Sequence, residues 1–138
     1  MKSIVRRLFP MLSVEDMARS LRFYRDLLDG SESYRFPETG TPAFMVVRLG
    51  DSDIGLGQLG NAPPLHGQVQ RPATGHRMEL CIYVEDVDAT VERLKQGGVP
   101  VLLEPQDQPW GERVAYVADP DGNLLMLTHD EASRPSEP

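Results

Sequence analysis

A repeat at about half the chain length is the feature that most limits the folds open to this sequence. The tripeptide Val14-Glu15-Asp16 recurs as Val84-Glu85-Asp86, which begins 70 residues later (84 − 14) in a chain of 138. At the same offset, apolar positions match apolar positions and a hydroxyl matches a hydroxyl: Met17 with Val87, Ser20 with Thr90, Leu21 with Val91, and Tyr24 with Leu94. Such a pattern indicates two copies of one supersecondary unit.

Each copy begins with a strand followed by a helix. In the first copy residues 8–14 are apolar and extended, and either Ser13 or Asp16 can cap the helix that follows. In the second copy the strand spans residues 80–84 and Asp86 is the expected cap. Apolar side chains then recur at helical spacing in both copies, up to Gly30 in the first and Gly97-Gly98 in the second. We expect Phe23 and Tyr24 to lie in the core.

Each helix is followed by segments with the pattern of a β-hairpin. Residues 43–49 and 54–59 flank one turn, and residues 114–118 and 124–128 flank the turn Asp119-Pro120-Asp121-Gly122-Asn123. The sequence therefore predicts one domain built from a first module (residues 1–60), a linker (61–75), a second module (76–129) and a disordered tail (130–138).

Composition and charge argue against several classes of partner. The net charge is −7, whereas nucleic-acid binding needs clustered Lys and Arg. No run approaches the ~20 apolar residues of a membrane span, and residues 1–7 lack the apolar core of a signal peptide. The single cysteine, Cys81, suits a reducing compartment and is expected to be a small buried filler. We expect a cytoplasmic protein that binds neither nucleic acid nor a membrane.

Three motifs carry a resemblance to a known superfamily. The runs Pro10-Met11-Leu12-Ser13-Val14-Glu15-Asp16 and Ser20-Leu21-Arg22-Phe23-Tyr24, with the turn Asp119-Pro120-Asp121-Gly122-Asn123-Leu124, are similar to signatures of the vicinal-oxygen-chelate superfamily. That superfamily includes glyoxalase I, dioxygenases and the bleomycin-resistance proteins. The resemblance implies an α+β fold in which two tandem βαβββ modules form a cupped mixed sheet. Pro10 and the segment Gln108-Pro109-Trp110-Gly111 further resemble the bleomycin-resistance proteins.

The positions at which metalloenzymes of this superfamily hold their metal ion are poorly supplied with donor atoms here. The resemblance places Phe9 and Glu79 at the two first-strand positions, and Gly55 and Met126 at the two last-strand positions. A hard or borderline divalent ion needs several O or N donors that converge on one point. His66, His76 and His129 lack ligand spacing and are expected to be exposed loop residues. We therefore expect no metal and no other cofactor.

Without a metal, the concave face would be an apolar hollow with one carboxylate. Such a surface suits a ligand with a flat aromatic part and a cationic group. The candidate ligand-binding residues are Phe9, Tyr34, Phe36, Phe44, Met78, Glu79, Trp110, Tyr116 and Met126. Trp110, a large ring in a Pro-Trp-Gly turn, is the strongest single indication of a ligand or an interface.

Several of these residues also have ordinary structural interpretations. Phe44 and Tyr116 could belong to the core, and Tyr34 and Phe36 could simply cover a sheet edge. Glu79 could form a salt bridge with Arg77 or Arg113. The acidic residues around Trp110 are expected to be solvated: Glu104, Asp107 and Glu112.

The leading hypothesis is a metal-independent protein that sequesters an aromatic, cationic small molecule, such as a bleomycin-type antibiotic, and performs no catalysis. The resemblance also implies a homodimer. A second hypothesis is a divalent-metal-dependent glyoxalase-like isomerase or extradiol-type dioxygenase with an atypical ligand set. A third is a metal-free enzyme or a partner-binding module of a biosynthetic pathway.

Overall fold

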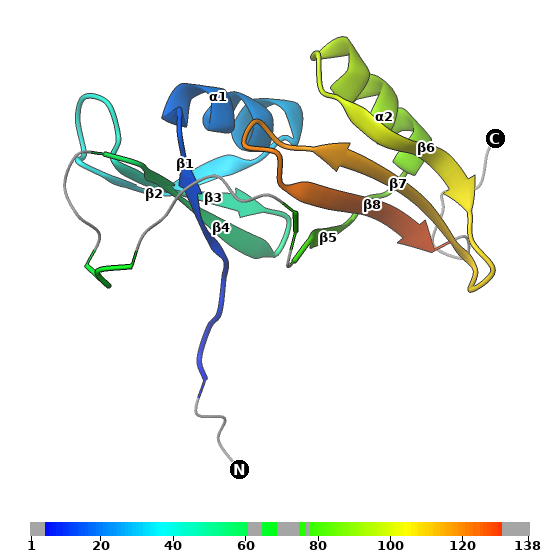
Figure 1. Cartoon of the computed structure of the whole chain (residues 1–138), viewed down its shortest axis with the longest axis horizontal. Helices are drawn as coiled ribbons and strands as arrows, with labels where there is room; N and C mark the ends of the chain where they lie inside the picture. The colour runs from blue at the N-terminus through cyan, green and yellow to red at the C-terminus, as the bar shows by residue number, and fades with distance from the viewer. Residues whose placement is uncertain (1–4, 61–64, 69–74, 77, 131–138) are drawn as a thin grey trace. The chain divides into compact units, whose positions relative to one another are not determined.

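The computed structural model describes residues 5–60, 65–68, 75–76 and 78–130. The chain divides into two compact units, residues 1–71 and 72–138, and each contains one module (Figure 1). Most of the predicted linker and all of the predicted tail after Asp130 lie outside the described residues. The two modules are described one at a time.

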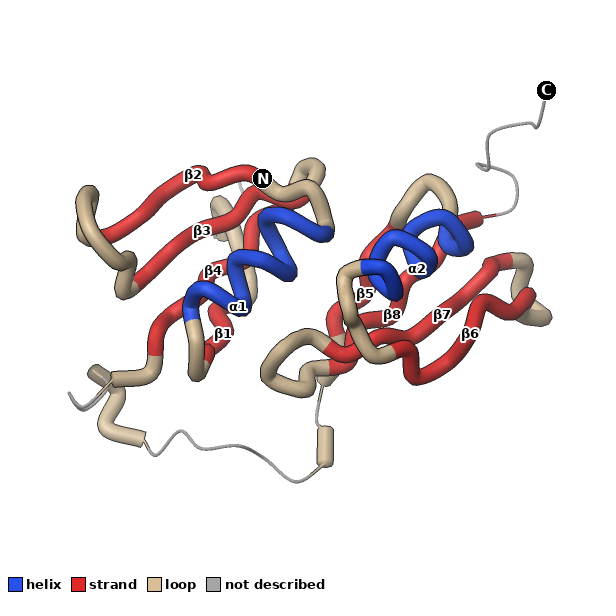
Figure 2. The backbone as a smooth tube through the Cα atoms, turned by 90° about the horizontal axis from the view of Figure 1, so that it is seen from above, coloured by secondary structure: helices blue, strands red, loops and turns tan. Residues whose placement is uncertain are grey.

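The first module is a four-stranded mixed sheet with a helix against one face. Its elements are β1 (Met11–Val14), α1 (Met17–Leu21) with its π-helical continuation η1 (Arg22–Leu27), β2 (Ser31–Phe36), β3 (Phe44–Leu49) and β4 (Ser52–Gln58). The strand order is β1-β4-β3-β2, and only the β1–β4 pair is parallel. Figure 2 shows α1 lying across its own sheet.

The second module repeats this arrangement. Its elements are β5 (Leu80–Tyr83), α2 (Val87–Gln96), β6 (Val101–Asp107), β7 (Glu112–Ala118) and β8 (Leu124–Asp130). The strand order is β5-β8-β7-β6, with β5 and β8 parallel and the other pairs antiparallel. Each module is thus a βαβββ unit, and the α+β fold that the resemblance implied is confirmed.

The core of each module lies between the sheet and its helix. Alternate strand residues, among them Met45, Val47 and Leu56, pack with the helical Phe23 and Tyr24, and all five are buried. In the second module the matching strand residues pack against the apolar stripe of α2: Val117, Leu125 and Leu127 against Val87, Val91 and Leu94. Because side chains alternate along a strand, the remaining half of the strand residues lie on the other face of each sheet. We call this other face the open face of the module.

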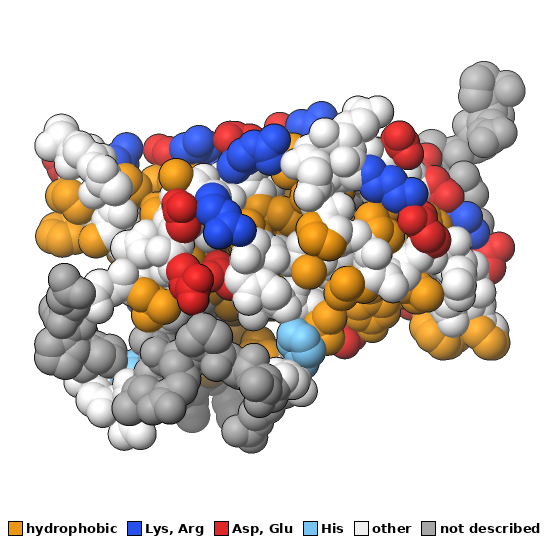
Figure 3. Space-filling model, turned by 45° about the horizontal axis from the view of Figure 1, so that its top comes forward, with side chains coloured by type: hydrophobic (Ala, Val, Ile, Leu, Met, Phe, Trp, Pro, Cys, Tyr) orange, Lys and Arg blue, Asp and Glu red, His pale blue; other side chains and the backbone are white. Residues whose placement is uncertain are grey.

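The outward side of the helices and of the edge strands carries interspersed charges (Figure 3). Exposed ion pairs occur there, such as Arg25 with Asp26 and Glu32, and Lys95 with Glu104. Exposed pairs of this kind contribute little to stability. No helix within the described ranges is long and apolar enough to cross a membrane.

The entry to each helix has the same design. Asp16 and Asp86 are the N-caps, and their Oδ1 atoms accept from the amides of Arg19 and Ala89. Ser13 therefore does not cap the first helix. A side chain near the end of the last strand accepts the amide of the first helical residue. It is Gln58 Oε1 for Met17 (2.8 Å), and His129 Nδ1 for Val87 (2.9 Å).

His129 is therefore not the exposed loop residue that the sequence predicts. It is the penultimate residue of β8 and is 1% exposed, because strand pairing with β7 continues to Asp130. His66 and His76 are exposed, as expected. The sequence also predicts a first strand from residue 8. The strand begins only at Met11, after Pro10, which has no amide N–H for the ladder.

Candidate functional site

The open face of the first module is lined by aromatic side chains. Its rows are set by register: Met11, Gly55, Val46 and Tyr34 lie across from one another, and Gly57, Phe44 and Phe36 form the next row. The rings of Tyr34 and Phe44 are 6.1 Å apart between centroids. Phe44 is half-buried, whereas Tyr34 and Phe36 are exposed. The structure thus brings these three predicted residues together on one sheet face.

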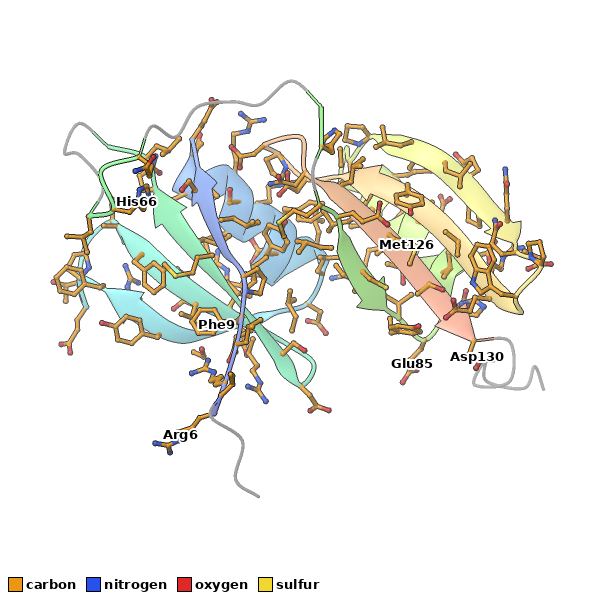
Figure 4. The ribbon with its side chains drawn as sticks, turned by 60° about the horizontal axis from the view of Figure 1, so that its bottom comes forward. Arg6, Phe9, His66, Glu85, Met126 and Asp130 are labelled. Carbon is orange, nitrogen blue, oxygen red and sulfur yellow. The ribbon has the colours of Figure 1, made fainter. Side chains whose placement is uncertain are left out.

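Phe9 lies just before β1, on the open side of this sheet (Figure 4). The guanidinium of Arg7 sits over its ring, 4.7 Å from the centroid. Arg7 also pairs with Asp53, a buried carboxylate that Arg48 contacts at 3.3 Å. The acidic group on this face is therefore compensated by two arginines, and Phe9 already has a cation on its ring.

The open face of the second module has a different character. Register places Cys81, Met126 and Tyr116 in one row, and Tyr83, Thr128 and Val114 in the next. Figure 4 shows Met126 on β8, on the side of the sheet away from α2. Met126 is partly buried, and Tyr83 is 68% exposed. This face combines aromatic rings with sulfur atoms, both of which suit flat, polarisable ligands.

Two carboxylates on this face are held by neutral donors. The Tyr116 hydroxyl donates to Glu79 Oε1 at 2.8 Å, and the Trp110 Nε1–H donates to Glu112 Oε1 at 2.7 Å. The hydrogen bond to Glu79 raises the pKa of Tyr116, and a hydrogen bond to Glu112 raises the pKa of Tyr83. Glu79 and Glu112 therefore each hold a nearby phenol in its neutral, donating form.

Neither carboxylate has a cationic partner among the described residues. Salt bridges in this module join Lys95 to Glu104, and Arg113 to Asp88 (2.6 Å) and Asp107 (2.9 Å). Arg113 is thus committed elsewhere and does not pair with Glu79, while Arg77 lies outside the described residues. An ionised carboxylate that accepts only from a phenol or an indole keeps its charge available to a ligand.

Cys81, on β5, lies between the carboxylates of Glu79 and Glu112. It is exposed, so the expectation of a buried filler is wrong. The reason is the strand alternation, which puts Leu80 and Ile82 towards the helix and Cys81 on the open face. Partial burial of the thiol raises its pKa, and Glu112 and Glu79 raise it further.

Glu112, Tyr83 and Cys81 also belong to this face, although the sequence did not predict them there. Glu112, expected to be solvated, is half-buried and receives the Trp110 N–H. A signal was present: Glu79, Cys81 and Tyr83 alternate along β5 as Glu112, Val114 and Tyr116 do along β7. Met78 is exposed just before β5 and is out of step with that alternation.

The residues at the superfamily's metal positions do not fit a metal ion. Phe9 and Gly55 in the first module offer no donor side chain. In the second module Glu79 stands with Met126, which has only a thioether. Within the described ranges, no group of three or more His, Cys, Asp or Glu side chains could hold an ion.

Two tandem βαβββ modules, each with one helix-covered face and one open face, define the class of protein. The chain belongs to the glyoxalase/bleomycin resistance protein/dioxygenase superfamily, whose family model matches residues 7–127. The fold class and the superfamily inferred from the motifs are thereby confirmed. The bleomycin-resistance subgroup remains an expectation.

Relatives and solved structures of several kinds are similar to this chain. Mouse methylmalonyl-CoA epimerase is 33% identical over 125 residues, covering 88% of this chain and 70% of the relative. Lactoylglutathione lyase of Haemophilus influenzae is 30% identical over 132 residues, covering 92% and 94%. The crystal structure of a glyoxalase-related enzyme from Fulvimarina pelagi aligns with a TM-score of 0.75 at 22% identity, covering 91% of this chain and 89% of that one.

Proposed function

We propose that this protein binds an aromatic cation on the open face of its second module, without a metal ion and without chemical change to the ligand. The observation that carries the proposal is the Glu79 carboxylate, which is oriented by the Tyr116 hydroxyl and has no cationic partner among the described residues. A charge held in this way by a neutral donor is a ready acceptor for an ammonium or amidinium group.

The side chains of the same face supply the surface for the flat part of the ligand. The Tyr116 ring lies beside Glu79, whereas the exposed Trp110 ring, tethered through Nε1 to Glu112, lies at the other end of the face. Stacking on such a ring contributes about 0.5–1.5 kcal/mol beyond the area buried, and a cation over the ring adds a similar amount. Met126 in the floor offers a polarisable, adaptable contact. Met78, exposed just before β5, is a further candidate contact.

We propose that the open face of the first module binds a flat aromatic ring without an accompanying cationic group. Tyr34, Phe36 and Phe44 present the rings, and Phe9 is already covered by Arg7. Phe36→Ala removes an exposed ring without touching the core, so any loss of ligand affinity in that variant reports a direct contact at this face.

Ligand binding is tested by isothermal titration calorimetry with benzamidine, a flat monocation that should bind saturably. Glu79→Gln keeps an acceptor for Tyr116 but removes the charge, and should weaken binding about tenfold. Glu92→Gln, a change of equal charge on the exposed side of α2, should leave the affinity unchanged. Equal affinities for all three proteins would contradict a role for Glu79.

Sequestration predicts that the ligand returns intact. After incubation with a bleomycin-type antibiotic and denaturation of the complex, mass spectrometry should recover the unmodified compound. A turned-over product would instead support catalysis. Two similar proteins are named as an epimerase and a lyase, and this favours an isomerase as the second candidate function.

We further propose that the protein is a homodimer. An open module leaves sheet edges unpaired, and association of two copies is a common way to cover them. Sedimentation equilibrium should give twice the 15.4 kDa chain mass. A mass of one chain at micromolar concentration would refute this part of the proposal.

A further inference from the structure

The open face of the second module carries a second carboxylate, Glu112, that has no cationic partner in the part of the chain that the structure describes, and it lies at the far end from Glu79. In the strand register Glu112 lies opposite Asp130 of β8, whereas Tyr116 lies opposite Met126, which is itself opposite Cys81 of β5. Glu79 precedes Cys81 by two residues. In the register, Glu79 and Glu112 are therefore about six residue steps apart along the strands, or on the order of 20 Å between backbones.

Side chains on this face contact each carboxylate. The Tyr116 hydroxyl donates to Glu79, and the Trp110 indole, from the turn before β7, donates to Glu112. Cys81 lies between them and is influenced by both carboxylates, since each contributes to the raised pKa of its thiol. The floor from one end to the other is formed by Cys81, Met126, Tyr83 and Thr128.

One buried polar group in this floor has no partner within the described residues. Thr128 is 0% exposed, and its Oγ1 makes no hydrogen bond. Register places it between Tyr83 and Val114, on the same face as Met126. An orphaned buried hydroxyl costs about 1–3 kcal/mol unless something satisfies it. A ligand lying along this floor could supply the missing partner.

We propose that the ligand of this face carries two cationic groups joined by a flat or apolar spacer, with one cation on Glu79 and the other on Glu112. The proposal rests on the proposed function and extends it, because it assigns a role to Glu112 and defines the ligand as a dication. Each carboxylate is oriented by an aromatic donor, and the spacer lies over the sulfur and ring atoms between them.

The test compares benzamidine with bis-benzamidines whose linkers contain three, five or seven carbons. Trp110 fluorescence and calorimetry measure the affinity of each probe. If both carboxylates are used, the best bis-benzamidine should bind at least about tenfold more tightly than benzamidine. Glu112→Gln keeps the acceptor for Trp110 and should abolish that advantage, so that the best bis-benzamidine binds this variant no more tightly than benzamidine does. Glu79→Gln should weaken both probes.

The possible outcomes separate the two proposals. Benzamidine binding without any advantage for the bis-benzamidines, or an advantage that survives in Glu112→Gln, overturns the dication while the proposed function stands. Failure of every probe to bind overturns both. Glu92→Gln, the matched control, should retain the full advantage, and circular dichroism of Glu112→Gln should match the native spectrum, which confirms that the variant is folded.

Discussion

At the residue scale, the candidate site is distinguished by the partners of its carboxylates, which are neutral hydrogen-bond donors and not cationic side chains in the described structure. Asp53, on the first module, is buried and shared by Arg7 and Arg48, so its charge is used within the protein. Glu79 and Glu112, on the second module, accept only from phenol and indole groups in the described structure. The same kind of side chain is thus structural in one place and available to a ligand in the other.

The phenol–carboxylate contacts can be tested by titration. Because Glu79 raises the pKa of Tyr116 and Glu112 raises that of Tyr83, removing either charge should lower the pKa of its phenol. In Glu79→Gln and Glu112→Gln, absorbance at alkaline pH should therefore show one of the four tyrosines ionising at lower pH than in the native protein. Titration curves identical to the native one would mean that these hydrogen bonds do not form in solution.

Cys81 offers an independent probe of the same face. Its raised pKa leaves little thiolate near neutral pH, so alkylation by iodoacetamide at pH 8 should be slower than that of a free thiol. The rate should increase in Glu112→Gln, which removes one cause of the shift. Alkylation should also block benzamidine binding, since the thiol lies in the floor. A fully alkylated protein that binds benzamidine normally would place the ligand elsewhere.

At the element scale, the repeated helix entry joins each helix to the last strand of its module. Gln58 and His129 do the same task, although one is an amide and the other an imidazole. Because Nδ1 of His129 accepts a hydrogen bond, the proton of the neutral ring lies on Nε2, which is buried and has no partner among the described residues. His129 is therefore a structural residue.

Two substitutions of His129 distinguish its role as acceptor for the Val87 amide from its role as a packed ring. His129→Leu leaves the buried Val87 amide unsatisfied and should lower the free energy of unfolding by about 1–3 kcal/mol. His129→Gln offers the acceptor that Gln58 provides in the first module, so it should recover part of that loss. Urea denaturation measures both. Equal stability of the native protein and the Leu variant would contradict the capping role.

The sequence predicted the helices and the hairpin strands, but it gave no bounds for β2 and β6, began the first strand too early and predicted only part of the site. The repeat, the Asp caps and the hairpin turns predicted both helices and the hairpin strands, because these features are local. Cys81 and His129 were misplaced, since their surroundings depend on strand pairing across more than 40 residues. Trp110, Tyr116 and Glu79 were predicted to line one pocket together with residues of the first module, which stays a prediction. The contact between Glu112 and Trp110 could not be read from their spacing.

At the scale of the whole molecule, superfamily membership leaves the chemistry open, because this fold carries several activities. The donor set at the metal positions favours the proposed metal-free binding, because Phe9, Gly55 and Met126 supply no hard ligand and Glu79 alone offers a carboxylate. The acidic balance of the chain, −7, agrees with a cationic ligand and would favour its approach at low ionic strength.

The most direct test of metal-free binding on the second module is a calorimetric titration of the protein with benzamidine before and after exhaustive treatment with a chelator. Metal-free binding predicts saturable binding with the same stoichiometry and affinity in both samples. Binding that disappears after chelation and returns on addition of a divalent metal would contradict it, and would show that this chain builds a metal site from ligands other than Phe9, Gly55 and Met126.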